Sequence, residues 1–270
     1  MNKNRNRDDF RFIFVTQDDP FYVMSFFEEF LGSYGRLGEV EGVVICSAMG
    51  KRRITRLMGQ MYGFYGPVDF FRMGMRYASS KALARAPAAL RGGRSLDLTQ
   101  LCRAHEIRVV HTDEVNSPAF LHTLREINPD LIVSVAAPVI FKKAVIELPR
   151  YGCINIHNAT LPKYRGMMPN FWQLYHGEKK VGITIHEINE GIDDGGILLQ
   201  REVDVLPGET LDSVIRRTKK LGAHLMIEAL EAIKAGNVRY MENASSEATY
   251  YSFPTREDVR EFRRRGRRIV

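Results

Sequence analysis

The sequence predicts an α/β fold built on one doubly wound, mostly parallel sheet with helices on both faces. Three observations support this prediction. Short apolar runs rich in β-branched residues alternate with helix-like segments along the first half of the chain, which is the pattern of parallel βαβ units. These runs are mostly apolar, as expected for strands that are buried on both faces. Beyond Val181 the pattern changes to alternation, which indicates a hairpin-like extension of the sheet.

Five apolar runs are the predicted strands of the parallel part: residues 10–16, 40–46, 107–111, 131–136 and 153–157. Helices are predicted over residues 20–31, 96–105 and 117–127. Ser117 and Pro118 suit the start of the last helix, because a serine side chain caps free backbone N–H groups and proline fits the first helical position. In such a sheet the ligand binds beyond the carboxyl ends of the strands.

Two alternating runs, residues 183–188 and 197–205, flank a turn rich in glycine and aspartate and are the predicted hairpin. A long helix is predicted over residues 210–235, with Thr210 as its cap and Gly236 as its stop. We therefore expect one domain over residues 1–236 and a short Arg-rich C-terminal tail over residues 237–270.

Positive charge is concentrated in two segments, although the net charge of the whole chain is +7. Residues 51–94 contain ten lysines and arginines against one acid, Asp69, and residues 256–268 contain seven arginines against three acids. Such a surface favours an anionic partner such as a nucleotide, an RNA or a phospholipid. Residues 51–94 form a basic amphipathic insertion. It is either a helical pair packed on the sheet edge or a segment that docks the substrate or a membrane surface.

Several motifs are absent from the sequence, and their absence bears on the cellular compartment and on the functional class of the protein. No apolar stretch near the N-terminus resembles a signal peptide, and none reaches the roughly 18 residues of a membrane span. The three cysteines, Cys46, Cys102 and Cys153, have no metal-ligand spacing, and the first and last sit in strand-like runs as small buried hydrophobes would. We expect a cytoplasmic protein. The motifs of dinucleotide-binding, P-loop and zinc-protease sites are absent.

Three polar residues stand at the predicted ligand edge of the sheet. Asn155 and His157 alternate on one predicted strand, so their side chains share a face at its exit. Asp193 lies in the turn between the two later strands. An amide can stabilise an oxygen that becomes negative during attack on a carbonyl, and a histidine beside a carboxylate can take up a proton. The set therefore suits acyl transfer; the alternatives are polar groups of the core, or a metal site that includes His186.

The segment GCINIHNATLPKYRG at residues 152–166 resembles the signature of the folate-dependent formyltransferases. This family includes methionyl-tRNA, glycinamide ribonucleotide and sugar N-formyltransferases. The resemblance continues through DLIVSVAAPVIFKKAVIELP at residues 130–149 and GITIHEINEGIDDGGILLQ at residues 182–200. It implies a Rossmann-like sheet of the formyltransferase type, with the catalytic domain over residues 1–236.

The resemblance also implies a role for each matching residue. Asn155 would hold the formyl oxygen, His157 would handle the proton, and Asp193 would orient His157 and bind an ordered water. The formyl donor would be 10-formyltetrahydrofolate. The residues that bind it would be Val139, Ile140, Phe141, Asn189, Asp193 and Gly195. Asp194 adds a second acid beside Asp193, so the sequence leaves open which of the two is catalytic.

The acceptor is expected to be a primary amine, and an amino sugar linked to a nucleotide is the preferred prediction. The 34 residues after Gly236 are too few for the C-terminal barrel with which methionyl-tRNA enzymes of the family hold tRNA. Lys51, Arg52 and Arg53 stand where those enzymes carry a basic loop, so methionyl-tRNA is the alternative acceptor. After the first strand the chain reads TQDDPFY, without the Gly-Ser-rich phosphate loop of the purine-pathway enzyme.

Overall fold

The computed structural model describes residues 10–19, 21–35, 37–47, 54–85, 95 and 97–270. Its strands are β1 (Arg11–Gln17), β2 (Glu39–Cys46), β3 (Val109–His111), β4 (Leu131–Val135), β5 (Cys153–His157), β6 (Arg165–Gly166), β7 (Lys180–Glu187), β8 (Ile197–Asp204) and β9 (Tyr250–Tyr251). Its helices are α1 (Tyr22–Ser33), α2 (Ile54–Ala84), α3 (Leu98–Ala104), α4 (Pro118–Ile127), α5 (Lys143–Ile146), α6 (Pro169–Tyr175), α7 (Leu211–Ala235) and α8 (Arg256–Arg264), with a 3₁₀ turn at Ser245–Glu247.

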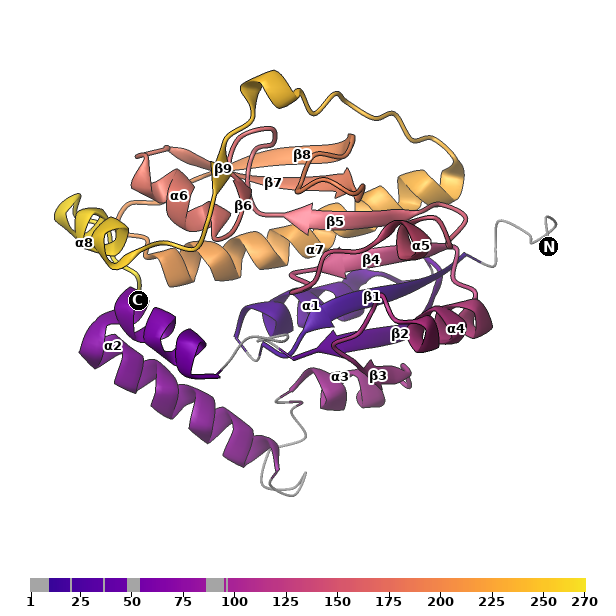
Figure 1. Cartoon of the computed structure of the whole chain (residues 1–270), viewed down its shortest axis with the longest axis horizontal. Coiled ribbons are helices and arrows are strands. Elements are labelled where there is room, and N and C mark those ends of the chain that lie inside the picture. The colour runs from indigo at the N-terminus through magenta and orange to yellow at the C-terminus, as the bar shows by residue number, and fades with distance from the viewer. Residues whose placement is uncertain (1–9, 20, 36, 48–53, 86–94, 96) are drawn as a thin grey trace.

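Among the described residues, seven strands form one sheet in the order β3-β2-β1-β4-β5-β7-β8 (Figure 1). The first five strands in the chain are parallel, whereas β7 runs antiparallel to both β5 and β8. The predicted doubly wound, mostly parallel sheet with a hairpin-like extension is therefore confirmed. Because β1 lies between β2 and β4, the strand order reverses there, and a crevice is expected at the carboxyl ends of β1 and β4.

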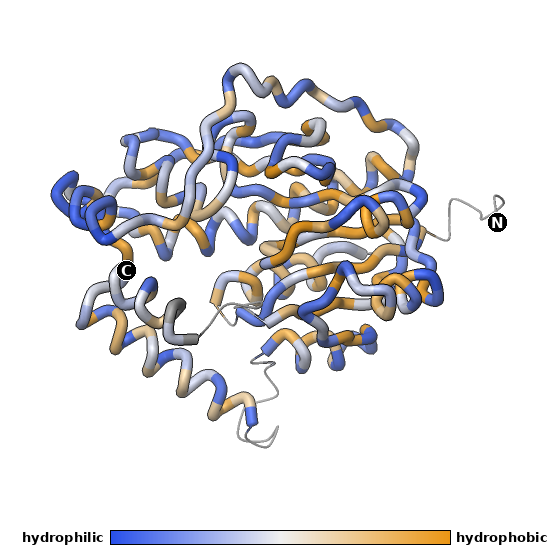
Figure 2. The backbone as a smooth tube through the Cα atoms, in the orientation of Figure 1, coloured by the Kyte–Doolittle hydropathy of each residue, from blue (hydrophilic) through white to orange (hydrophobic). Residues whose placement is uncertain are grey.

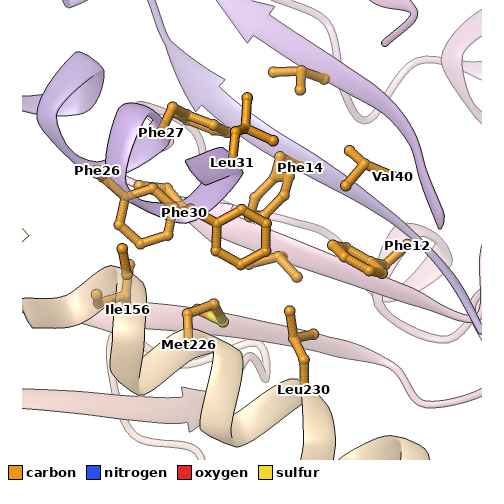
Figure 3. Close-up of a cluster of buried hydrophobic side chains, with 14 of the residues drawn as sticks. Phe12, Phe14, Phe26, Phe27, Phe30, Leu31, Val40, Ile156, Met226 and Leu230 are labelled. Carbon is orange, nitrogen blue, oxygen red and sulfur yellow. The ribbon is translucent and has the colours of Figure 1, made fainter. Parts of the chain in front are cut away.

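Apolar side chains cover both faces of the sheet. On one face Phe12 and Phe14 of β1 pack against α1 and α7, and the rings of Phe14 and Phe27 meet edge to face with centroids 5.0 Å apart (Figure 3). On the other face α4 and α5 cover Ile13 and Val15. Alternate residues of β1 thus point to opposite cores, which explains why the parallel strands are the most hydrophobic stretches of the chain (Figure 2).

Helix ends follow the predicted caps. The Ser117 side chain accepts a hydrogen bond from Phe120 N, Thr210 forms a capping box with Ser213, and Gly236 ends α7 with a φ of 71°. The strand predicted at residues 107–111 is shorter than expected, because a turn at Glu106, with a φ of 59°, delays its start to Val109. The predicted first helical residue Pro20, the insertion residues 51–53 and Leu96 lie outside the described residues.

Residues 54–84 form α2, in which two helical parts meet at Gly66, with a φ of 74°. The helical pair is as expected, but its location differs from the sheet-edge interpretation. Phe64 is buried and packs on Phe171 of α6 and on Phe253, so this part of α2 packs on the C-terminal elements. Figure 1 shows α2 beyond the ends towards which β4 and β5 point. This places α2 over the edge of the sheet where ligands bind.

The residues after Gly236 fold back onto the rest of the chain. β9 pairs with β6, and α8 buries Phe262, whose ring stacks on Phe171 with centroids 4.6 Å apart. The amide of Leu211 at the start of α7 donates a hydrogen bond to Arg268 O. These contacts build a third apolar core between α2, α6, α7 and α8. The division at residue 236 stays a prediction.

All three cysteines are buried and free, as expected for Cys46 and Cys153. Burial raises the pKa of Cys46 to about 11 and that of Cys102 to about 12, so both thiols stay protonated at neutral pH. None of the helices described is long and apolar enough to cross a membrane.

Candidate functional site

A cavity of about 870 Å³ lies at the carboxyl ends of β1, β4 and β5. It is lined by Gln17 at the end of β1, by Ala136 after β4, and by Asn155 and His157 of β5. This is the switch point of the strand order, where the two crossovers leave the sheet in opposite directions. The topology of the sheet thus creates the crevice, and β5 supplies the polar side chains Asn155 and His157 that line it.

Asn155 and His157 reach the cavity because they alternate on β5 with buried Ile154 and Ile156. The two isoleucines belong to the core under α1 and α7. Asn155 pairs with His186 across the antiparallel ladder between β5 and β7. The alternation predicted from sequence therefore places both polar side chains in the cavity rather than in a closed core.

His157 is 5% exposed, and both ring nitrogens have partners. Its Nε2 donates to the carbonyl of Tyr164 at 2.8 Å, and its Nδ1 lies 3.5 Å from Asp193 Oδ2. The Tyr164 carbonyl can only accept, so it fixes the proton of a neutral ring on Nε2 and leaves the lone pair on Nδ1. Burial lowers the pKa of His157, against the opposing charge of Asp193, so the neutral ring is the resting form at pH 7.

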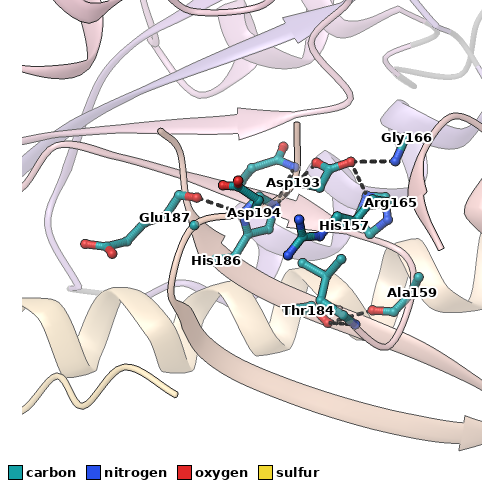
Figure 4. A network of polar contacts seen from close by, with 12 residues as sticks. His157, Ala159, Arg165, Gly166, Thr184, His186, Glu187, Asp193 and Asp194 are labelled. Atoms are coloured by element: carbon teal, nitrogen blue, oxygen red, sulfur yellow. Dashed lines mark hydrogen bonds and ion pairs between the residues drawn. The ribbon is translucent and has the colours of Figure 1, made fainter. Parts of the chain in front are cut away.

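Asp193 stands between two histidines in the loop after β7, with a left-handed φ of 51°. Its Oδ2 accepts a hydrogen bond from Gly166 N at 2.8 Å, and its Oδ1 lies 3.6 Å from His186 Nε2 (Figure 4). Burial opposes its ionisation, but His157, His186 and the Gly166 amide outweigh burial and hold the pKa of Asp193 well below its usual range. The site therefore contains a carboxylate beside a neutral imidazole.

The structure also distinguishes the two adjacent acids of this loop. Asp194 accepts a hydrogen bond from Asn189 Nδ2 at 2.6 Å within the exposed loop, whereas Asp193 faces His157. The two carboxylates thus have different partners although they are neighbours in sequence. Asp193, the acid to which the resemblance assigns a role, is thus the one that lies beside His157.

His186 was considered from sequence only as a possible metal ligand. Its Nδ1 donates to the Glu187 carbonyl at 2.7 Å, and its Nε2 lies 3.1 Å from Asn155 Nδ2. A neutral His186 can then accept one N–H of the Asn155 amide and leave the other N–H free. The alternation of residues 183–188 indicated the face on which His186 lies, but its contact with Asn155 depends on the strand register.

Two further residues lie near Asp193: Asn243, which carried no signal in the sequence, and Arg165, which stands in the segment 152–166 without a role assigned to it. Asn243 donates from Nδ2 to the carbonyls of Asp193 at 3.0 Å and Gly195 at 2.9 Å. Its Oδ1 accepts from Arg165 Nη2 at 2.8 Å, and Arg165 is fully buried. Asn243 comes from the C-terminal segment, so that segment holds the loop that carries Asp193.

The cavity has two parts, which lie towards opposite faces of the sheet. The loop half is lined by residues 136–141 and 188–193, and Val139, Phe141 and Ile188 pack in the core under α4 and α5. The helix half is lined by side chains of α1, α2, α6 and α7 and by Asp19.

Most of the residues expected to bind folate lie in the loop half: Val139, Ile140, Phe141, Asn189 and Asp193. Gly195 does not line the cavity; it packs against the Glu187 carbonyl so closely that a Cβ would collide with it. Within the described ranges, no three His, Cys, Asp or Glu side chains are arranged to hold a metal ion. The histidines His157 and His186 instead lie 3.5 and 3.6 Å from the Asp193 carboxylate and make their hydrogen bonds to other residues.

Known proteins are similar to this chain in sequence and in fold. The sequence model of the formyl transferase family matches residues 85–230. A methionyl-tRNA formyltransferase of Thermotoga maritima is 38% identical over 155 residues, which are 57% of this chain and 50% of that protein. The chain thus spans about half the length of the curated relatives it matches.

Two solved structures show the same fold at low identity. A sugar N-formyltransferase from a Shewanella species superposes with a TM-score of 0.55 and 19% identity, covering 90% of this chain and 76% of that one. Glycinamide ribonucleotide transformylase 1 from Symbiobacterium toebii gives a TM-score of 0.59 and 18% identity, covering 90% of this chain and 99% of that one. The family match includes the strand that carries Asn155 and His157 and the loop that carries Asp193. The chain therefore belongs to the formyl transferase family.

Proposed function

We propose that this protein is an N-formyltransferase that moves a formyl group from 10-formyltetrahydrofolate to the primary amine of a nucleotide-linked amino sugar. The observation that carries the proposal is the convergence of Asn155, His157 and Asp193 on one cavity at the switch point of the sheet. These are the three residue types that the resemblance assigned to formyl transfer, and they come from two different elements of the fold.

The loop half of the cavity suits the folate. Val139, Phe141 and Ile188 offer an apolar wall, and the backbone groups of residues 136–141 and 188–193 offer donors and acceptors for a heterocyclic ring. The segment 136–141 is held in place at its end, because the Asn116 side chain donates to Ile140 O at 2.9 Å and accepts from Lys142 N at 2.8 Å. The folate supplies the formyl group, and Asn155 and His157 stand beside this half.

Each polar side chain has a role that its geometry permits. The free N–H of the Asn155 amide would donate to the formyl oxygen as negative charge develops there. The attacking nitrogen must lose a proton, and the lone pair on His157 Nδ1 would accept one, directly or through a water. The resulting imidazolium would face the ionised Asp193 at the present 3.5 Å. It would return the proton to N10 of the folate as the bond between N10 and the formyl carbon breaks, so that tetrahydrofolate leaves. Tyr164 O, together with Asp193, orients the imidazole ring.

The helix half would take the acceptor. Met61, Phe64 and Tyr65 of α2 line it together with Phe253. These side chains bound the space and offer aromatic faces on which a nucleotide base can stack. The cavity volume of about 870 Å³ is typical of a small-molecule site, which favours a small acceptor over a macromolecule.

A direct assay tests the proposal. The protein is incubated with 10-formyltetrahydrofolate and a uridine- or thymidine-diphosphate amino sugar, and the N-formyl product is detected by mass spectrometry. Asp193→Asn should lower turnover by roughly a hundredfold or more, because it removes the charge that stabilises the imidazolium. Asp194→Asn is the matched control and should retain turnover within a few-fold. Failure of wild-type protein to bind 5-formyltetrahydrofolate in calorimetry would refute the donor assignment.

Methionyl-tRNA is the second candidate acceptor, since the curated relative from Thermotoga maritima carries that name. Exposed Arg72 and Arg85 on and after α2 offer positive charge to a polyanion. Binding of tRNA through many phosphates should weaken steeply with salt, by about one power of the salt concentration per phosphate contact. A nucleotide sugar with two phosphates should show a shallow dependence. Rapid formylation of methionyl-tRNA at physiological salt would establish the alternative.

A further inference from the structure

A lysine lines the helix half of the cavity where α7 is otherwise apolar. Leu211, Ile215 and Lys219 follow one another at four-residue spacing on α7, and all three line the cavity. Residues at this spacing share one face of a helix. Lys219 is 8% exposed, whereas its neighbour Lys220 is exposed to solvent. A single buried ammonium group thus faces the region assigned to the acceptor.

No described residue makes a hydrogen bond or an ion pair with this ammonium group. The opposite charge that acts on it is that of Asp19, whose Oδ1 already accepts hydrogen bonds from Phe21 N at 2.8 Å and Tyr22 N at 3.2 Å. Burial lowers the pKa of Lys219 to about 8, against the attraction of Asp19. A buried charge without a close partner is unfavourable in the empty site, and an anion that binds there would relieve this cost.

A second unpaired donor lines the same cavity. Asn170 of α6 is 4% exposed, and its Nδ2 has no hydrogen-bond partner among the described residues. Asn170 and the next residue, Phe171, both lie on α6, the helix that lines the helix half. Buried donors in native proteins are almost always satisfied, so an unpaired one in a cavity indicates an acceptor on the ligand.

We propose that Lys219 and Asn170 form a subsite for an anionic oxygen group, a phosphate or a carboxylate, that the acceptor carries near its reacting amine. The inference rests on the proposed function for the identity of the acceptor, but the subsite itself is a property of the cavity. Both donors lie away from the loop half, so the formyl donor does not use them. The acceptor is therefore an amine with a negative charge close by.

Binding of small anions tests the subsite without any reaction. Protein saturated with 5-formyltetrahydrofolate is titrated with inorganic phosphate and, separately, with acetate, and the dissociation constant is measured by calorimetry. Wild-type protein should bind one of the two saturably, which identifies the anion. Lys219→Met should weaken that binding by roughly 30-fold or more, as expected for loss of a charged hydrogen-bonding partner. Asn170→Ala should weaken it by roughly tenfold, and Lys220→Met should leave it unchanged.

The same variants are then compared in the formylation assay with a nucleotide-linked amino sugar, an amino uronic acid and glucosamine. Lys219→Met should raise the KM for the acceptor with the preferred anion, with little change in the KM for glucosamine or in the affinity for folate. Equal anion affinity in wild type and Lys219→Met, or weaker folate binding in Lys219→Met, would overturn the inference. Anion binding that depends on Lys219 without formylation of any amine would refute the proposed function and leave the subsite standing.

Discussion

Replacing Lys219 by methionine should stabilise the free protein, because the substitution removes a buried charge. The pKa of Lys219 lies at about 8, against an ordinary value of 10.5. Each pKa unit corresponds to about 1.4 kcal/mol, so the buried ammonium group costs about 3 kcal/mol of folding free energy at neutral pH. With an unfolding entropy of roughly 2.1 cal/mol/K per residue, this equals a rise in Tm of about 5 °C for a chain of 270 residues.

The pH dependence of this gain in stability follows from the direction in which the pKa of Lys219 is shifted. The folded-state pKa is lower than the unfolded one, so the cost is full below pH 8 and disappears as pH rises past 10.5. Urea unfolding of wild type and Lys219→Met should therefore differ by about 3 kcal/mol at pH 7 and by about 1 kcal/mol at pH 9.5. Lys220→Met should change stability by less than about 0.5 kcal/mol. A Lys219→Met protein less stable than wild type at pH 7 would refute the reasoning.

Three further outcomes are expected around the catalytic loop. Asn243→Ala should lower kcat by about tenfold with little change in the KM for either substrate, since it frees the backbone that carries Asp193; unchanged kcat would show that the C-terminal segment does not position the loop. The acid limb of the pH profile of kcat/KM should lie below pH 6.5, the ordinary pKa of histidine, because burial favours the neutral form of His157; a midpoint above that value would mean that Asp193 dominates. Gly195→Ala should lower both Tm and kcat, because its Cβ would push against the Glu187 carbonyl; normal values for both would contradict this packing.

Periodicity in the sequence was sufficient to predict the architecture. Runs such as residues 131–136 are almost entirely apolar, as expected for strands buried on both faces. The caps Ser117 and Thr210 depend on hydrogen bonds to residues three positions away, so local sequence is enough to predict them. Asn155 and His157 could be placed on one face for the same reason, since alternation along a strand is a local property. The folate-binding roles of the predicted residues stay predictions.

Contacts between segments far apart in the chain could not be predicted from local sequence patterns. Asn243 reaches Asp193 across 50 residues, and nothing in its own neighbourhood marks it. The contact of His186 with Asn155 depends on the register between β5 and β7, in which a shift of one residue would turn His186 to the other face.

The sequence by itself therefore determined the fold class, the family signature and the strand and loop that carry the residues proposed to be catalytic. The tertiary structure decided which acid faces His157, that α2 lines the cavity, and that Lys219 is buried instead of solvated. The physical reason is that the orientation of a side chain along one element depends on local geometry. Its partners and its burial, in contrast, depend on how the crossovers of the sheet bring distant elements together.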